Sequence, residues 1–218
     1  MALFELDGLQ FNSSPGKVVR KISFVLQRAT VVWVKGPSGE GKTTLLKSLA
    51  RLTSPVGGEM SLDGVSWRSI PATAWRRSVV YLHQKPVLFP GTVRSNILTA
   101  FDLKTRAKQA PDMESAKEML ARLMLPVELL EQDALTISVG EACRVALIRA
   151  LIAKPRVLLL DEPTSALDAN AGEVLAALLQ EWISTGDRGI VGASHDEALM
   201  DRLPGRQIDL RGLNLVRP

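Results

Sequence analysis

Short apolar runs alternate with segments of helical periodicity along most of this 218-residue chain. Residues 30–34 form an apolar, β-branched run, and the wholly apolar run 157–160 is typical of a central parallel strand covered on both faces. Leu45, Leu46 and Leu49 recur at helical spacing soon after the first of these runs. Strands that alternate with helices in this way predict an α/β fold.

The same apolar runs and helical spacings predict the remaining elements, and strands predominate in the first third of the chain. We expect strands at residues 3–11, 18–26, 30–35, 59–62, 78–83, 157–160, 189–193, 206–210 and 213–216. We expect helices from about residue 138 to 153, at 169–184 and at 196–202.

The middle of the chain has a different pattern, which is helical from about residue 92 to residue 135. Residues 113–125 place apolar side chains at helical spacing, whereas residues 105–112 are polar and contain a proline, as loops do. The α/β pattern is therefore expected to be interrupted by a helical insert at roughly 85–150.

The composition is that of an ordinary globular protein, with 46% hydrophobic and 23% charged residues. We expect neither a membrane span, which needs roughly 18 apolar residues, nor a signal peptide. The single cysteine, Cys143, excludes an internal disulfide and fits a reducing cytosol. The net charge of +4 comes without a long basic run, so we do not expect nucleic acid as a partner.

The strongest chemical signal is the segment GPSGEGKT at residues 36–43, which fits the phosphate-binding pattern G-x-x-x-x-G-K-[ST]. Its glycines let the backbone bend so that N–H groups point at an anion, and the helix that follows adds its positive N-terminal end. Lys42 supplies a charge for the outer phosphates, and Thr43 supplies a hydroxyl for Mg²⁺. The sequence therefore predicts a site for a nucleoside triphosphate.

Two acidic residues, Asp161 and Glu162, end the apolar run 157–160. Such a strand delivers its terminal carboxylates to the ligand-binding edge of a parallel sheet. We expect Asp161 to hold Mg²⁺ and Glu162 to polarise a water that attacks the γ-phosphate. His195 also ends an apolar strand, so its ring is expected to reach the same edge and hydrogen-bond the γ-phosphate.

Six motifs along the chain resemble those of the nucleotide-binding subunit of an ABC transporter, in the order found in that family. They are residues 36–43 (Walker A), Gln84 (Q-loop), residues 137–141 with the following helix (signature), residues 157–162 (Walker B), residues 165–168 (D-loop) and His195 (switch histidine). The resemblance covers nearly all of the chain.

The resemblance implies an α/β fold built on a P-loop NTPase core with an N-terminal antiparallel β region. The core would comprise residues 1–84 and 151–218. An α-helical subdomain, residues 85–150, would be inserted between the Q-loop and the signature helix and would carry the signature motif.

The resemblance also implies ATP and Mg²⁺ as cofactors and assigns roles to individual residues. The implied catalytic residues are Glu162, His195, Gln84 and Lys42, and the implied metal ligands are Thr43, Gln84 and Asp161. Phe11 matches the aromatic residue that stacks on adenine, as an aromatic ring can. The implied nucleotide contacts are Phe11, Gly36, Pro37, Ser38, Gly39, Glu40, Gly41, Lys42, Thr43, Thr44, Ser138, Gly140 and Asp168.

The signature segment departs from the family's usual Leu-Ser-Gly-Gly-Gln, because Val139 replaces the first glycine. A positive φ at this position would strain a β-branched residue by about 1–3 kcal/mol. Residues 138–141, SVGE, also form a capping box, in which Ser138 caps the helix and Val139 starts it with a negative φ. In that interpretation Val139 adds only bulk near the second subunit's ATP, which predicts a working but slowed ATPase.

In the family, the P-loop of one subunit meets the signature segment of a second copy across two ATP molecules. The resemblance therefore implies an ATP-dependent homodimer that closes on ATP and opens after hydrolysis at Glu162. Since no membrane span is expected, the partner would be a transmembrane permease subunit on a separate chain. The protein would then be cytoplasmic and peripheral on the inner face of the cell membrane.

Residues 87–97 resemble exporter-type ATPases, and the short chain resembles small bacterial subunits grouped with iron or metal exporters, so export is the expected direction. The alternative is a non-transport ABC ATPase that acts in nucleic-acid repair, chromosome structure or translation. Residues 44–136 are too few for the coiled coils of the repair and chromosome types. Translation types carry two such domains, and one is found here.

Overall fold

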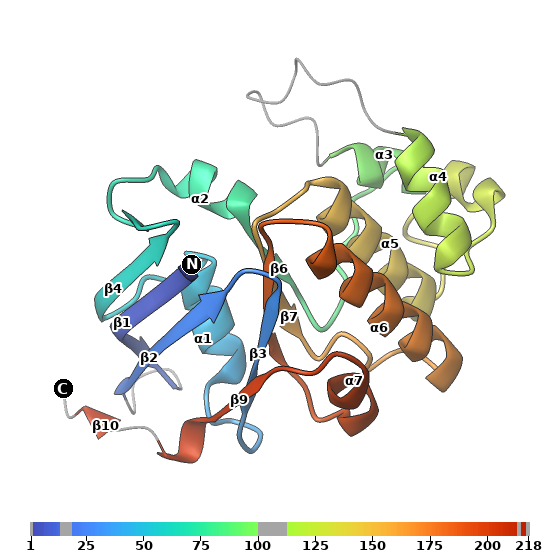
Figure 1. Cartoon of the computed structure of the whole chain (residues 1–218). Helices are drawn as coiled ribbons and strands as arrows, with labels where there is room; N and C mark the ends of the chain where they lie inside the picture. Colours follow the sequence, from blue (N-terminus) through green and yellow to red (C-terminus); the bar gives the residue numbers. More distant parts are fainter. Residues whose placement is uncertain (1, 14–18, 100–112, 213–214, 217–218) are drawn as a thin grey trace.

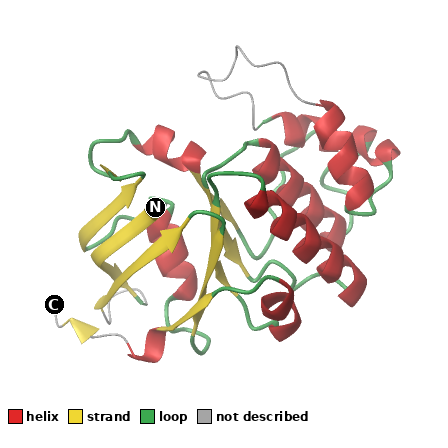
Figure 2. Cartoon of the chain, viewed as in Figure 1, coloured by secondary structure: helices red, strands yellow, loops and turns green. Residues whose placement is uncertain are grey.

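The computed structural model describes residues 2–13, 19–99, 113–212 and 215–216, which form two five-stranded sheets and the helices around them (Figure 1). The strands gather on one side of the molecule, and most of the helices lie on the other (Figure 2). Among the described residues, no helix combines the length and apolar character that crossing a bilayer requires.

The first sheet is antiparallel throughout, as expected for the N-terminal region. Exposed and buried side chains alternate along most of its second strand, because one face packs on the core and the other faces solvent. In spatial order the sheet contains β10 (Leu215–Val216), β2 (Val19–Gln27), β1 (Ala2–Asn12), β4 (Gly57–Leu62) and β5 (Val65–Ser66).

The second sheet is parallel throughout. Every residue of its β7 and β8 strands is buried, which confirms the prediction that the apolar run at 157–160 is a covered central strand. In spatial order the sheet contains β6 (Val79–Leu82), β7 (Val157–Asp161), β8 (Gly189–Ala193), β3 (Thr30–Lys35) and β9 (Arg206–Asp209).

In the described part of the chain, buried apolar side chains form two clusters on opposite faces of the parallel sheet. Val157 and Leu159 point to the cluster that holds α1 and the antiparallel sheet, whereas Leu158 and Leu160 point to the cluster that holds most of the helices. The helices are α1 (Lys42–Leu49), α2 (Ala72–Ser78), α3 (Val93–Leu98), α4 (Met113–Arg122), α5 (Val139–Ile152), α6 (Ala169–Ser184) and α7 (Glu197–Arg202), with 3₁₀ turns η1 (Val127–Glu131) and η2 (Leu210–Gly212).

Several predicted elements differ from the structure. The predicted strand at 78–83 begins one residue later, because Ser78 ends the unpredicted helix α2. That helix is held by Trp75, which is fully buried and donates its indole N–H to the Leu49 carbonyl at 2.8 Å. The predicted strand at 206–210 ends at Asp209, because the turn η2 begins at Leu210. The predicted loop at 105–112 lies outside the described residues.

A close approach between β3 and β8 requires glycine at position 192. Trp33 is fully buried, is the register partner of Gly192, and donates its indole N–H to the Leu203 carbonyl at 2.9 Å. A Cβ atom at position 192 would lie 2.2 Å from a carbon of the Trp33 ring. The strand that leads to His195 is therefore packed directly beneath an indole ring.

We expect Gly192→Ala to lower the free energy of unfolding by about 1–3 kcal/mol, because an added methyl group forces Trp33 or the strands to shift. Gly186→Ala is the control, since its nearest neighbour would be an arginine nitrogen 3.9 Å away, and it should change stability by less than about 0.5 kcal/mol. Urea unfolding measures both variants, and equal stability for Gly192→Ala and wild type would contradict the packing.

Candidate functional site

The predicted phosphate-binding loop joins β3 to α1 at the edge of the parallel sheet where β3 ends. Gly41 caps α1 with a φ of 94°, a left-handed conformation that glycine adopts without strain. A Cβ atom there would also lie 2.7 Å from the Cα atom of Ser13. Both the backbone conformation and the space at this position therefore require glycine.

Lys42 begins α1, and its side chain curls back over the loop instead of reaching solvent. Only 8% of the residue is exposed. Its ammonium group donates to the carbonyl oxygens of Gly36 at 2.5 Å and Pro37 at 3.2 Å, and it lies 3.1 Å from Nε2 of His195. The charge is thus held in the loop by acceptors that a phosphate group can replace.

Asp161, at the end of β7, is held by two hydroxyl groups. Its Oδ2 atom accepts from Thr43 at 2.8 Å and from Tyr81 at 2.7 Å, and the residue is 3% exposed. Burial, together with the hydrogen bond to this carboxylate, raises the pKa of Tyr81 far above its usual value. Sequence analysis missed Tyr81, although a tyrosine hydroxyl within an apolar strand is a signal for a buried partner.

Glu162 and His195 meet because β7 and β8 pair in parallel and end together, with Asp161 opposite Ala193. Oε2 of Glu162 accepts from the backbone N–H of His195 at 3.1 Å, and Oε1 lies 3.6 Å from Nε2 of the His195 ring. Glu162 has a φ of 48°, a conformation rare outside glycine and typical of functional sites.

A second contact ties together the segments that follow these two residues. Thr164 donates its hydroxyl to Oδ2 of Asp196 at 2.7 Å. Asp196 also caps α7, since its other carboxylate oxygen accepts from the backbone N–H of Leu199 at 3.1 Å. The segments after Glu162 and His195 are therefore linked by side chains as well as through the sheet, a connection that the motifs did not indicate.

Lys42, Asp161, Glu162 and His195 all line one cavity of about 410 Å³. Its lining residues are Ser13, Ser38, Gly39, Gly41, Lys42, Thr43, Thr44, Gln84, Asp161, Glu162 and His195. Gly36 and Pro37 line a second cavity of about 270 Å³ that shares His195. The structure thus brings together most of the predicted site, whereas Glu40 points away from both cavities and pairs with Arg20.

Phe11 does not have the predicted position. Its side chain has no exposed surface and packs in the apolar cluster between the antiparallel sheet and α1. Stacking on a base requires an open ring face, so the expected adenine contact is wrong for this structure. Ser13, two residues later, does line the cavity.

The predicted capping box at the start of α5 is confirmed. The Ser138 hydroxyl accepts from the backbone N–H of Glu141, and the Glu141 carboxylate accepts from the backbone N–H of Ser138 at 2.8 Å. The hydrogen bonds from Ser138 lower the pKa of Glu141. Val139 begins the helix without a positive φ, and it is 63% exposed.

Besides Phe11 and Glu40, three residues assigned to nucleotide binding lie outside the two cavities. Ser138 and Gly140 are at the N-terminus of α5, and the Asp168 carboxylate caps α6 by accepting from the backbone N–H of Ala171 at 2.8 Å. Their contact with a nucleotide stays a prediction, because it depends on a second copy of the chain.

Comparison with known proteins agrees with this geometry. A family model described as ABC transporter matches residues 19–165, which is more than half of the chain. The chain belongs to the ABC transporter family. Its ATP-binding cassette contains the parallel sheet, the P-loop and the carboxylate strand described above.

Relatives of this cassette include the Escherichia coli K12 protein named "Probable iron export ATP-binding protein FetA", which is 32% identical over 89% of the chain and 85% of FetA. "Protein STAR1" of rice is 38% identical over 86% of the chain but only 53% of its own length. The solved dimeric structure of MJ0796, a bacterial ABC transporter cassette, superposes with a TM-score of 0.82 at 24% identity, covering 95% of this chain and 94% of that one. This last likeness shows the fold.

We expect Val139→Gly to hydrolyse ATP faster than wild type, by up to about tenfold. The reason is that the exposed valine side chain would narrow the space through which the ATP of a second subunit approaches the N-terminus of α5. The capping box should survive the change, so the melting temperature should fall by only a few degrees. Steady-state phosphate release measures the rate, with Val65→Gly, an exposed valine on β5, as the control. Equal rates for Val139→Gly and wild type would show that Val139 imposes no penalty.

Proposed function

We propose that this chain is the ATP-binding and ATP-hydrolysing subunit of an ABC transporter. The observation that carries the proposal is the convergence of Lys42, Asp161, Glu162 and His195 on one cavity beside a P-loop. The loop's backbone N–H groups and the Lys42 ammonium group would hold the phosphates. On binding, Lys42 would exchange the loop carbonyls for phosphate oxygens, which carry more negative charge.

The cavity fits a Mg²⁺ ion together with the triphosphate. Thr43, Asp161 and Gln84 all offer oxygen atoms to it, and hard oxygen donors are the ligands that Mg²⁺ prefers. No group of three or more His, Cys, Asp or Glu residues among the described residues forms a metal site by itself. This agrees with an ion that is completed by phosphate oxygens and water. When bound, Mg²⁺ would offset the charge of the phosphate oxygens.

Glu162 is proposed to act as the base that polarises the attacking water. Its carboxylate is held by the His195 backbone N–H and remains 18% exposed at the cavity. The His195 side chain is 60% exposed and lies near both Lys42 and Glu162. Its ring would hydrogen-bond the γ-phosphate and lose that hydrogen bond when the phosphate is released.

A Glu162→Gln variant should bind ATP normally but hydrolyse it at least about 100-fold more slowly, because general-base catalysis contributes 10²–10⁴-fold. We expect it to accumulate as an ATP-bound dimer, measured by size-exclusion chromatography with light scattering. Lys42→Ala is the control, which should neither bind ATP nor dimerise. Full activity in Glu162→Gln would exclude Glu162 as the base.

A separate groove supports a transmembrane permease as the partner. It has a volume of about 630 Å³, and among the described residues that line it there is no carboxylate. Arg149 of α5 borders it, donates to the Val87 carbonyl at 2.7 Å and lies 5.4 Å from the centre of the Phe89 ring. Burial lowers the pKa of Arg149. The groove's lining combines apolar side chains with the basic residues Lys47, Arg76, Arg77 and Arg149, which fits an apolar segment that carries negative charge.

Export is the proposed direction, at the inner face of the membrane. FetA is named for iron export, and a further solved relative, a bacterial Atm1-family exporter, superposes with a TM-score of 0.76 at 24% identity. The match covers 90% of this chain and 35% of that exporter chain.

We expect Val87→Asp to abolish co-purification with a membrane protein encoded beside this gene, because the substitution places a charge among apolar groups of the docking surface. Val87 is 56% exposed, so the substitution should spare the fold and the basal ATPase rate. Val65→Asp, at a valine that is 48% exposed on β5, is the matched control. Undiminished co-purification of Val87→Asp would refute docking at the groove.

A further inference from the structure

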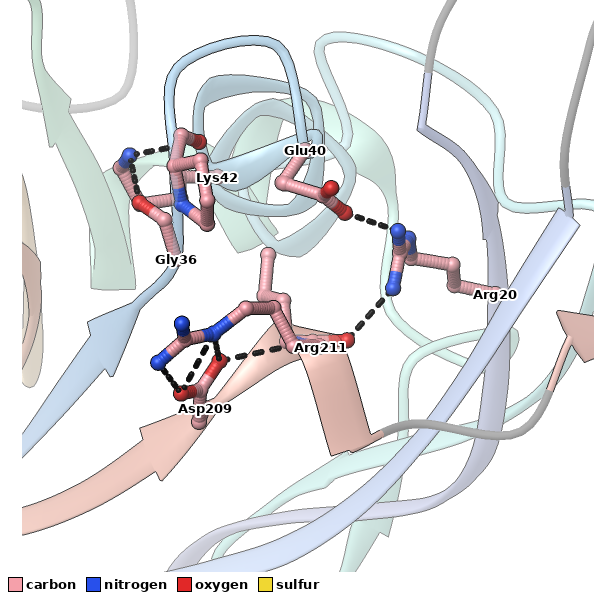
Figure 3. A network of polar contacts seen from close by, with 8 residues as sticks. Arg20, Gly36, Glu40, Lys42, Asp209 and Arg211 are labelled. Atoms are coloured by element: carbon pink, nitrogen blue, oxygen red, sulfur yellow. Dashed lines mark hydrogen bonds and ion pairs between the residues drawn. The ribbon is translucent and has the colours of Figure 1, made fainter.

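A glutamate inside the phosphate-binding loop is held by an arginine from the other sheet (Figure 3). Glu40 lies between Gly39 and Gly41, and its Oε2 atom pairs with NH2 of Arg20 on β2. The Arg20 side chain is only 11% exposed, and that of Glu40 is 28% exposed. Both side chains are partly buried, and Arg20 is the least exposed arginine among the ion pairs of the described residues.

Arg20 also reaches a third segment. Its NH1 atom donates to the backbone carbonyl of Leu210, in the turn η2 that follows β9. Leu210 is fully buried, and a Cβ atom at Gly36 would lie 3.5 Å from Leu210 Cβ and 3.6 Å from Glu40 Cβ. One guanidinium group therefore joins β2, the loop and η2.

The turn η2 is itself braced. The Asp209 carboxylate accepts from the side chain of Arg211 at 3.0 Å and from its backbone N–H at 2.9 Å. These hydrogen bonds lower the pKa of Asp209 to about 2. Arg20 therefore contacts a turn whose flanking residues, Asp209 and Arg211, are joined by hydrogen bonds (Figure 3).

The sign of the Glu40 charge makes the pair relevant to phosphate binding. A carboxylate in a loop that receives a triphosphate opposes binding by repulsion, unless a cation offsets it and turns it away. Arg20 does both, because it neutralises Glu40 and holds its side chain outside the cavity lined by Lys42 and Thr43. The loop also contains three glycines with positive φ, at positions 36, 39 and 41, and glycine is the residue with the greatest backbone freedom.

We propose that Arg20 is a positioning residue of the ATP site, which holds the phosphate-binding loop in its binding conformation through Glu40. The inference rests on the proposed function of ATP binding. The ion pair holds the loop in its binding conformation before ATP binds. Loss of the pair should therefore weaken ATP binding more than it slows turnover of bound ATP. Arg20 contacts no reacting group. Without Arg20, the Glu40 carboxylate would be an unpaired negative charge in the phosphate-binding loop.

The test is a double-mutant cycle with Arg20→Ala, Glu40→Ala and the double variant, measured by titration with MgATP and by steady-state hydrolysis. Arg20→Ala should raise Kd and KM for ATP about tenfold, with kcat changed less than about twofold, because the coupling of contacting charged groups is of this size. Glu40→Ala should have a smaller effect. Adding Glu40→Ala to Arg20→Ala should restore part of the affinity, because it removes the unpaired carboxylate.

Two further readouts separate positioning from a merely structural role. High salt should reduce the defect of Arg20→Ala, because the lone carboxylate is screened, and Arg20→Lys should recover part of the affinity. Arg28→Ala is the matched control, since Arg28 lies in the turn that follows β2 and pairs with Asp63 and Asp187 instead of Glu40. It should leave Kd unchanged.

The outcomes distinguish the inference from the proposed function. If wild type and Lys42→Ala are equally unable to bind ATP, the proposed function fails. If wild type binds ATP and Arg20→Ala binds it equally well, or if the effects of the two single variants simply add, the role of Arg20 is refuted. A lower melting temperature for Arg20→Ala with an unchanged Kd also overturns it.

Discussion

The parallel pairing of β7 with β8 is the constraint on which the rest of the structure depends. Both strands are buried on both faces, so their register is set by packing against two apolar clusters. That register places Asp161 opposite Ala193, and the residues that follow each strand, Glu162 and His195, then meet at the same edge. A slip of one residue in either strand would exchange the faces of that strand and separate these groups.

Around this edge, the site is held by contacts that a ligand would rearrange. Lys42 rests on loop carbonyls and beside His195, Asp161 is shared by Thr43 and Tyr81, and Glu162 is held by a backbone N–H. Each of these contacts gives a charged group a partner within the protein. The arrangement therefore stabilises a loop and a carboxylate edge that are already close to their binding geometry.

Much of the fold could be read from the sequence, because apolar periodicity and the glycine-rich loop are local signals. The buried strand at 157–160 and the capping box at Ser138 are examples. Phe11 shows the limit, since one aromatic residue fits a stacking role and a core role equally well until packing is known. Tyr81 and the pair of Arg20 with Glu40 depend on contacts between segments far apart in the chain, and no local pattern records those.

The central claim is that the cavity at the ends of β3, β7 and β8 receives the triphosphate of ATP. A crystal structure of the chain with MgATP tests this most directly. We predict that the β- and γ-phosphates occupy the cavity, that the Lys42 ammonium group leaves the carbonyls of Gly36 and Pro37 for phosphate oxygens, and that Glu162 faces the γ-phosphate. A triphosphate bound elsewhere, or a Lys42 that keeps its loop contacts with ATP present, would contradict the account.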